Sequence, residues 1–260
     1  MPRKVARYGW IPDLPDHRDY VFAAAPRILA KLPRKIDLTK RCPAVYDQGD
    51  IGSCTANAIG GTIQFDQLKQ KLRKRFMPSR LFIYYNERVM ENTIDEDAGA
   101  MIRDGIKSVA KEGVCPEKMW PYDSEAFPPN PRLTRKPSPR CYKEALKHTA
   151  VQYERVPRNL SQMKGCLASG FPFVIGFTVY ESFESDEVAK SGVMPMPGTR
   201  EHVLGGHAVM AVGYDDRLDR FRMRNSWGKD WGIRGYFTMP YAYLLDENLS
   251  DDFWKITLVR

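Results

Sequence analysis

The sequence predicts an α+β protein built from two lobes, and three observations support this prediction. In the first half of the chain, small and apolar residues recur at the spacing of one helix face. Beyond about residue 170, apolar residues gather instead in short runs that are rich in β-branched and aromatic side chains, as strands are. Between these regions, six prolines from Pro121 to Pro139 interrupt any regular pattern, which is typical of a long surface connection. We therefore expect a helical N-terminal lobe at about residues 42–130 and a β-sheet lobe at about residues 140–260.

The first expected helix begins at Cys54. From there, small or apolar residues recur at alternating steps of four and three as far as Leu72, which gives the helix one apolar face. Gly60 and Gly61 lie inside it, and each costs about 1 kcal/mol relative to alanine. We therefore expect another element to pack closely against these glycines. Two more helices are expected, one opened by Pro78-Ser79 and running through Met90, and one marked by Ile102, Ile106 and Val109 and ended by Gly113.

Five short runs in the second half of the chain are expected to form strands, because each is rich in β-branched or aromatic residues. Residues 1–31 precede both lobes and are expected to form an N-terminal arm, with residues 32–260 as the main domain. The expected strands are Phe171–Tyr180, Ala208–Tyr214, Phe221–Ser226, Tyr236–Met239 and Phe253–Val259.

Composition narrows the class of protein. With 260 residues, of which 43% are hydrophobic, the chain can bury one large core or two smaller ones. It contains no run of about 20 apolar residues that could span a membrane. The net charge of +8 is scattered, and the basic runs at residues 69–75 and 132–140 lack an aromatic platform or a nucleic-acid-binding motif. We expect these runs to be solvated faces, with no membrane or nucleic-acid partner.

The cysteines and the start of the chain bear on cofactors and compartment. Outside Cys54, the four other cysteines do not have the spacing of metal ligands, so we expect no metal and no other cofactor. The first twenty residues contain no apolar stretch of the kind found in a secretory signal peptide. We therefore expect a reducing compartment such as the cytoplasm, or export without a recognisable signal peptide.

Four residues from three parts of the sequence supply the groups that a thiol hydrolase needs. Gln48 and Cys54 lie in one glycine-containing run, and His207 and Asn225 follow far downstream. In this order they would supply an oxyanion donor, a nucleophile, a base and a group that orients the base. A lone cysteine in a glycine-rich segment is ordinarily an inert buried thiol. The three partners in the required order favour catalysis at Cys54.

The chemistry needs these residue types for physical reasons. An isolated thiol titrates near ~8.5, so a nearby positive charge is needed to favour the thiolate at neutral pH. His207 as an imidazolium and the N-terminus of a helix starting at Cys54 would both supply it. The Cys54 backbone N–H and the Gln48 amide would then stabilise the oxyanion formed on a peptide carbonyl. His207 would protonate the leaving amine and activate the water that cleaves the thioester, and Asn225 would fix its tautomer.

At these residues the chain resembles the papain-like cysteine peptidases. The resemblance extends from about Leu32 to the end of the chain and includes the block Arg224-Asn225-Ser226-Trp227-Gly228. It implies a papain-like two-lobe fold with a barrel-like β lobe and an active-site cleft between the lobes. It also implies that Trp227 shields the bond between His207 and Asn225. Two positions depart from the family pattern: Ile51 replaces a disulfide-forming cysteine, and Thr55 replaces an aromatic residue.

The resemblance also suggests which residues bind substrate. Gly99-Ala100 falls where the family has a Gly-Gly pair whose backbone pairs with an extended peptide. Gly176 and the pair Gly205-Gly206 fall beside the main side-chain pocket and would leave it roomy. Asp251, or alternatively Asp252, falls at the bottom of that pocket. A carboxylate there would favour arginine two residues before the scissile bond.

We therefore interpret the chain as a cysteine endopeptidase that acts on proteins or peptides. The segments Phe177–Tyr180 and Gly205–Ala208 look closest to the cathepsin B branch, but the paired histidines of that branch's exopeptidase loop are not evident. Two alternatives remain. One is an acyltransferase or amidase of the same fold, and the other is a catalytically silent peptide-binding relative.

The N-terminal arm suggests a means of control. Residues 1–31 are too few to resemble the family's large helical propeptide, but they are rich in proline, arginine and aromatic residues. We expect the part from Tyr8 to Tyr20 to lie in or near the active-site cleft as a short prosegment and to lower activity. The alternative is a loosely packed terminal arm.

Overall fold

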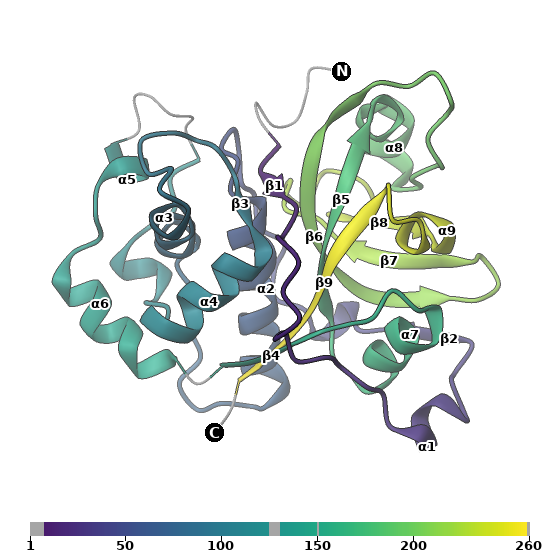
Figure 1. Cartoon of the computed structure of the whole chain (residues 1–260), viewed down its shortest axis with the longest axis horizontal. Coiled ribbons are helices and arrows are strands. Elements are labelled where there is room, and N and C mark those ends of the chain that lie inside the picture. Colours follow the sequence, from purple (N-terminus) through teal and green to yellow (C-terminus); the bar gives the residue numbers. More distant parts are fainter. Residues whose placement is uncertain (1–7, 125–130, 150, 259–260) are drawn as a thin grey trace.

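The computed structural model describes residues 8–124, 131–149 and 151–258. It contains a group of helices on one side, a large sheet on the other, and the N-terminal arm running between them (Figure 1). The α+β two-lobe architecture predicted from the sequence is confirmed. No helix in the described ranges has both the length and the apolar composition needed to cross a bilayer.

The helical lobe is organised around α2 (Cys54–Lys69), against which α3 (Arg80–Glu91) and α4 (Ile102–Glu112) pack. All three helices were predicted. Ser79 caps α3 by accepting a hydrogen bond from the Phe82 N–H, and Gly113 ends α4 with a φ of 74°. A Cβ on Gly61 would lie 2.8 Å from Nη1 of Arg224, so the predicted close packing at this glycine is confirmed.

The proline-rich segment was expected to be a surface connection, and most of its described residues are exposed or half-buried, with Leu133 and Pro137 as the exceptions. Residues 131–134 form a helical turn whose Leu133 is fully buried. The reason is the buried guanidinium of Arg88, which needs acceptors and donates to the carbonyls of Ile94, Glu96 and Leu133. Residues 125–130 lie outside the described ranges. The other short elements between residues 39 and 148 are β3 (Ala100–Met101), η1 (Thr39–Arg41), η2 (Glu117–Met119), α5 (Pro131–Thr134), α6 (Pro139–Ala145) and η3 (Leu146–His148).

The β lobe contains a seven-stranded sheet in the order β4-β9-β5-β6-β7-β8, with β2 paired to β6. The five predicted strands are present, although β6 begins earlier than expected and extends through the glycines before His207. Sequence analysis missed β2 and β4. These two are short, and β4 contains only two apolar residues, Val151 and Tyr153. The strands are β2 (Lys35–Asp37), β4 (Val151–Arg155), β5 (Phe173–Tyr180), β6 (Val203–Asp215), β7 (Arg220–Arg224), β8 (Tyr236–Pro240) and β9 (Ser250–Leu258).

Strand β5 serves both cores of the molecule. Phe173 and Ile175 belong to the core of the β lobe, whereas Val174 between them belongs to the core that contains α2. This alternation follows from the period of two along a strand. The helices α7 (Leu160–Ala168), α8 (Asp186–Ser191), α9 (Tyr241–Leu245) and η4 (Glu181–Glu184) complete the β lobe. Because one face of β5 belongs to the core that contains α2, this helix lies directly against the sheet, where it also contacts β6.

The chain before residue 32 divides into two parts. Phe22 and Ala24 are buried in the core of the β lobe, and α1 (Pro26–Leu29) packs against α7. Residues 8–20, by contrast, run between the lobes (Figure 1). We refer to residues 8–20 as the arm. The predicted domain boundary at residue 31 stays a prediction, as do the lobe boundaries at about 130 and 140.

One prediction on stability follows from Glu87, which is fully buried in α3. Its Oε2 accepts a hydrogen bond of 2.9 Å from Thr55 Oγ1, whereas Oε1 has no partner among the described residues. Burial raises the pKa of Glu87 well above its usual range. The folded state therefore holds this proton to a higher pH than the unfolded state. The stabilisation is fully present below the unfolded pKa of ~4.3 and is lost as pH rises through the folded pKa.

We therefore expect Glu87→Gln to raise Tm relative to the wild type by more at pH 8 than at pH 4, because glutamine keeps the hydrogen bond to Thr55 without ionising. Differential scanning calorimetry at the two pH values checks this. The exposed Glu247, changed to Gln, is the control and should show no such growth with pH. An equal change in Tm at both pH values for Glu87→Gln would contradict the prediction.

Candidate active site

Cys54 is the first residue of α2 and is fully buried. The loop before it is held by hydrogen bonds from the helical lobe. The Gly52 N–H donates to both carboxylate oxygens of Asp97, at 3.0 and 3.1 Å. Ser53 Oγ lies 2.6 Å from the hydroxyl of Tyr122. Sequence analysis missed Asp97, since it is far from Cys54 in the chain and lies in no recognisable motif.

His207 and Asn225 form a buried pair on neighbouring strands. His207 lies on β6, and its Nε2 is 2.8 Å from Oδ1 of Asn225, which directly follows β7. The same Oδ1 accepts the backbone N–H of Ser226 at 2.9 Å. The Trp227 ring lies over the imidazole, with centroids 5.0 Å apart and planes at 31°. Nδ1 of His207 has no hydrogen-bond partner among the described residues.

Gln48 is connected to this pair through Ser226. Its Oε1 accepts a hydrogen bond of 2.6 Å from the Ser226 hydroxyl, and its backbone N–H donates to the Ser226 carbonyl at 2.8 Å. Its Nε2 donates to the carbonyl of Ile51 at 2.9 Å. A primary amide has two N–H donors, so one remains for a ligand oxygen. Sequence analysis assigned no role to Ser226. Its hydroxyl holds Gln48 and its backbone N–H holds the side chain of Asn225.

The two departures from the family pattern have local partners. Ile51 is fully buried, and its carbonyl holds the amide of Gln48, as described above. Thr55 is also fully buried and donates to Glu87. The position that is usually aromatic is therefore occupied here by a hydrogen-bonded side chain that is joined to α3.

The Cys54 thiol lies beside the residue that follows His207. Backbone N–H groups of Ala208, Gly9 and Thr55 favour its anion, but burial outweighs them and raises the pKa of Cys54 to about 12. Burial also lowers the pKa of His207 to about 4, against the opposing effect of the Asn225 hydrogen bond. At neutral pH, both groups are therefore neutral in this state. This differs from the expected thiolate and imidazolium because neither group has access to water.

The arm provides part of this burial. Its strand β1 (Trp10–Ile11) pairs in parallel with β3, with Trp10 opposite Ala100. The Ala100 N–H donates to the Gly9 carbonyl at 2.7 Å, and a Cβ on Gly99 would lie 2.3 Å from the same oxygen. Gly99 and Ala100, predicted to bind an extended peptide, are thus paired with the protein's own arm.

Trp10 occupies the predicted position of the main side-chain pocket. A Cβ on Gly176 would lie 1.9 Å from its indole, and one on Gly206 would lie 2.7 Å from it. Trp10 is 8% exposed, and its indole Nε1 donates to Oδ2 of Asp252 at 3.0 Å. We call the space bounded by Gly176, Gly206 and Asp252 the Trp10 site.

The two candidate acids at this site differ in position. Asp252 is 1% exposed and faces Trp10, whereas the side chain of Asp251 is 46% exposed and contacts Arg158 at 3.2 Å. The pairing of β5 with β9 shifts register between Val174 and Gly176, and Asp252 has a φ of 57°. Such an irregularity changes which side chain points to a given face. The second of the two acids, and not Asp251, therefore faces the Trp10 site.

Tyr8 extends the arm over the base. Its ring centroid is 5.9 Å from that of His207 and 6.2 Å from that of Trp227. A Cβ on Gly205 would lie 2.7 Å from Tyr8 Cβ, so this glycine permits the close approach. The arm therefore covers the nucleophile with Gly9, the base with Tyr8, and the predicted pocket with Trp10.

The other cysteines lie apart from this site. All five are free thiols. Within the described ranges, no cluster of three or more histidine, cysteine or acidic side chains could hold a metal ion.

Comparison with known proteins identifies the family. Residues 32–244 match the model of the papain family cysteine proteases. The crystal structure of xylellain, a cysteine protease from Xylella fastidiosa, superposes with a TM-score of 0.92 at 48% identity, covering 100% of this chain and 99% of that one. An uncharacterized peptidase C1-like protein of Acanthamoeba polyphaga mimivirus is 44% identical over 96% of this chain and 86% of its own length.

A cathepsin B-like protein of Giardia intestinalis is also similar. It is 31% identical over 76% of this chain and 64% of its own length, so the chain spans less than two thirds of that relative. The match to the family model covers most of this chain and includes every element that carries the Cys54 site. The chain belongs to the papain family and is a cysteine peptidase.

Proposed function

We propose that the protein is an endopeptidase that cleaves peptide bonds through an acyl-enzyme formed on Cys54. The observation that supports this best is the buried hydrogen bond of 2.8 Å between His207 and Asn225, beside a cysteine at the start of α2. This bond gives the imidazole a fixed orientation and leaves Nδ1 available to exchange a proton.

Catalysis in this proposal begins when the arm leaves. Water then reaches Cys54 and His207, which lowers the desolvation that keeps both neutral. A proton passes from the thiol to the imidazole, and the thiolate is stabilised by the α2 N-terminus and the nearby backbone N–H groups. The thiolate attacks the peptide carbonyl carbon. The Cys54 N–H and the free N–H of Gln48 would bind the oxyanion.

The remaining steps return the enzyme to its first state. His207 gives its proton to the leaving amine, so that the C–N bond breaks and a thioester remains on Cys54. It next takes a proton from water as the water attacks the thioester. The acid product leaves and the thiol is regenerated.

We expect Cys54→Ala and His207→Ala each to abolish peptide cleavage, because these residues react directly. Asn225→Ala and Gln48→Ala should leave measurable rates, and losing one oxyanion donor typically lowers kcat by about 10²–10³. The kcat and KM values on a fluorogenic peptide check this. Cys166→Ala, which removes a buried thiol of α7, is the matched control and should stay active. Normal turnover by Cys54→Ala would refute the site.

We further propose that the arm is a short inhibitory prosegment. Gly9, Tyr8 and Trp10 lie over the thiol, the base and the Trp10 site, respectively. A substrate cannot pair with Ala100 while Gly9 does so. The inhibitory part is residues 8–20, because Phe22 and Ala24 belong to the core of the β lobe.

We expect Trp10→Ala in the full-length chain to raise kcat/KM on a small peptide by at least about tenfold, which corresponds to ~1.4 kcal/mol of lost arm docking. Truncating a buried tryptophan usually costs more than this, about 3–5 kcal/mol. Leu14→Ala is the control on the same arm, since that side chain is 69% exposed. Unchanged kinetics for a folded Trp10→Ala variant would mean that the arm does not limit activity.

The Trp10 site also suggests a specificity. Oδ2 of Asp252 faces the indole, while Oδ1 is held by Arg155 at 2.9 Å. We propose that a substrate arginine two residues before the scissile bond replaces Trp10 and pairs with Oδ2. The small walls at Gly176 and Gly206 leave space for this side chain.

In a Trp10→Ala background, we expect substrates with arginine at that position to have at least about tenfold higher kcat/KM than substrates with leucine, since a charge-assisted contact is lost with leucine. Asp252→Asn should remove this preference. Asp251→Asn is the matched control and should keep it, because its carboxylate points to Arg158. A peptide library in which leucine or phenylalanine is preferred would contradict the assignment.

A further inference from the structure

Arg103 stands out because its guanidinium contacts the arm. It is the second residue of α4 and is almost fully buried. Its Nε and Nη2 donate to the two carboxylate oxygens of Asp19, the first at 3.2 Å, and its Nη1 donates to the carbonyl of Leu14. Within the described ranges, all hydrogen bonds of this guanidinium go to the arm. A cation–π contact with Trp254, 5.6 Å from the ring centroid, supports it from the β lobe.

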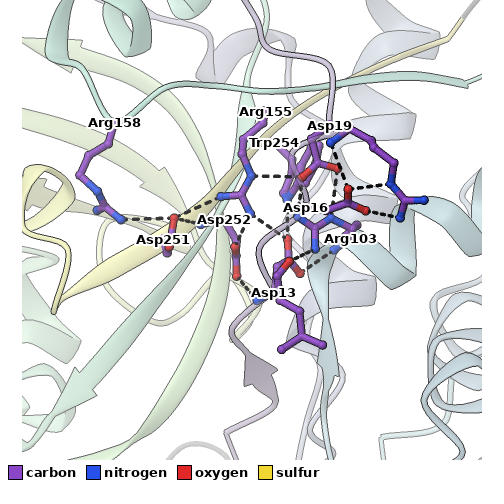
Figure 2. Close-up of polar contacts among 11 residues, drawn as sticks. Asp13, Asp16, Asp19, Arg103, Arg155, Arg158, Asp251, Asp252 and Trp254 are labelled. Carbon is purple, nitrogen blue, oxygen red and sulfur yellow. Dashed lines mark hydrogen bonds and ion pairs between the residues drawn. The ribbon is translucent and has the colours of Figure 1, made fainter.

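A second acid of the arm is bound nearby. The side chain of Asp13 is buried, and its Oδ1 accepts the Arg103 backbone N–H at 3.0 Å. Its Oδ2 accepts Trp254 Nε1 at 2.8 Å and lies 3.5 Å from Nη2 of Arg155. Arg155 Nε also lies 3.6 Å from Asp19. Figure 2 shows these arginines, one from α4 and one from β4, meeting the two arm acids from opposite lobes.

The two arginines differ in what they retain without the arm. Arg155 would keep Asp252 at 2.9 Å and Asp251 at 3.4 Å. The Arg103 guanidinium would lose the Asp19 carboxylate and the Leu14 carbonyl, which are all the acceptors that it has within the described ranges. A guanidinium in a partly buried place without a carboxylate is costly, and its planar fork matches a carboxylate well. The uncovered Arg103 therefore favours another acid.

We propose that Arg103, assisted by Arg155, forms a carboxylate-binding subsite beside the Trp10 site. In this structure Asp19 and Asp13 of the arm occupy it, and an acidic side chain of a peptide or protein ligand occupies it when the arm is displaced. The inference rests on the proposed function in one respect, namely that such a ligand enters the same space as the arm.

Of the three aspartates in the arm, two contact Arg103 and the third does not hydrogen-bond to it. Asp16 lies between Asp13 and Asp19 in the sequence, yet its carboxylate bonds to the exposed Arg18 of the arm. Asp13 and Asp19 turn toward the lobes instead (Figure 2). Asp16 is a useful comparison on the same segment, because its carboxylate accepts hydrogen bonds from Arg18 and only its more distant charge acts on Arg103.

The test uses full-length chains and measures the rate at which iodoacetamide alkylates Cys54, located by mass spectrometry. Cys54 is fully buried under the arm, so its labelling reports the open fraction. Cys166, buried in α7, is an internal control for global unfolding and must stay unlabelled on the same timescale. The labelling requires no peptide hydrolysis, so failure of the proposed endopeptidase activity would leave this test intact.

We expect Asp19→Asn and Arg103→Gln each to speed Cys54 labelling by at least about tenfold. The double variant should be no faster than the faster single variant, because both changes remove one interaction. Arg103→Lys should lie between the wild type and Arg103→Gln, since it keeps the charge and loses the fork. Asp16→Asn should change the labelling rate far less than Asp19→Asn, because its carboxylate makes no hydrogen bond to Arg103 within the described ranges. The proposal would be overturned if the fold increase in the double variant equalled the product of the two single increases. It would also be overturned if neither single variant labelled faster than the wild type.

A synthetic peptide with the sequence of residues 8–20 tests recognition of an acid on a separate ligand. Added to the Asp19→Asn chain, it should slow Cys54 labelling. The same peptide with asparagine in place of its last aspartate should need at least about tenfold higher concentration. On a chain that also carries Arg103→Gln, the difference in potency between the two peptides should be much smaller, because only the Arg155 contact at 3.6 Å is left to favour the aspartate. Equal potency of the two peptides on the chain that retains Arg103 would show that Arg103 does not recognise the carboxylate of the last aspartate.

Discussion

The packing of α2 against the sheet is the constraint on which the rest of the site depends. Gly61 lets Arg224 of β7 approach the helix, and Arg224 also donates to the Ala44 carbonyl at 2.6 Å and lies over the Tyr46 ring. The helix is thereby fixed against β6 and β7, the strands that carry His207 and lead into Asn225. Because Cys54 is the first residue of α2, a shift of this helix would move the nucleophile away from its base. A Cβ at Gly61 would lie 2.8 Å from Nη1 of Arg224, so the guanidinium would have to move and this contact between helix and sheet would be weakened.

The same burial that preorganises the site also keeps both reacting groups neutral while the arm is present. Desolvation acts in opposite directions on the two groups, since it raises the pKa of the thiol and lowers that of the imidazole. Both shifts favour the neutral pair. In the proposed mechanism, departure of the arm therefore does two things at once. It uncovers the position that a substrate would take, and it restores the solvation that an ion pair needs.

The residues proposed to react could be selected from the sequence because each lies in a local motif. Gln48, Cys54, His207 and Asn225 were recognised by their neighbours in the chain, and the glycines at 99, 176 and 206 by theirs. The same reasoning could not separate Asp251 from Asp252. Successive residues of a strand point to opposite faces, so a shift of one position in the register reverses the assignment. The register shift that decides it leaves no mark in composition or periodicity.

Contacts between distant segments were the other part that sequence could not supply. The roles of Asp97 and Ser226 depend on which side chains the fold brings to residues 48–52. Leu133 was assigned to a surface connection because prolines surround it, whereas the buried guanidinium of Arg88 draws its carbonyl inward. Trp10 was placed only as part of a segment that would lie near the cleft. Its position over two glycines is a tertiary fit that no local pattern encodes.

The attachment of the arm at both Phe22 and Trp10 explains how modest contacts can keep it in place. Phe22 is buried in the β lobe, so residues 8–20 are tethered close to their binding surface. A short tether gives an effective concentration in the mM range, so docking need not be tight to be nearly complete. A separate ligand lacks this advantage and must compensate with more favourable contacts in the same places. On this reasoning, a ligand that displaces the arm needs a side chain that fills the Trp10 site better than an indole does, together with an acid for Arg103. If the chain were cut between residues 11 and 20, the released piece would lose the tether, and dilution alone would then favour the open site.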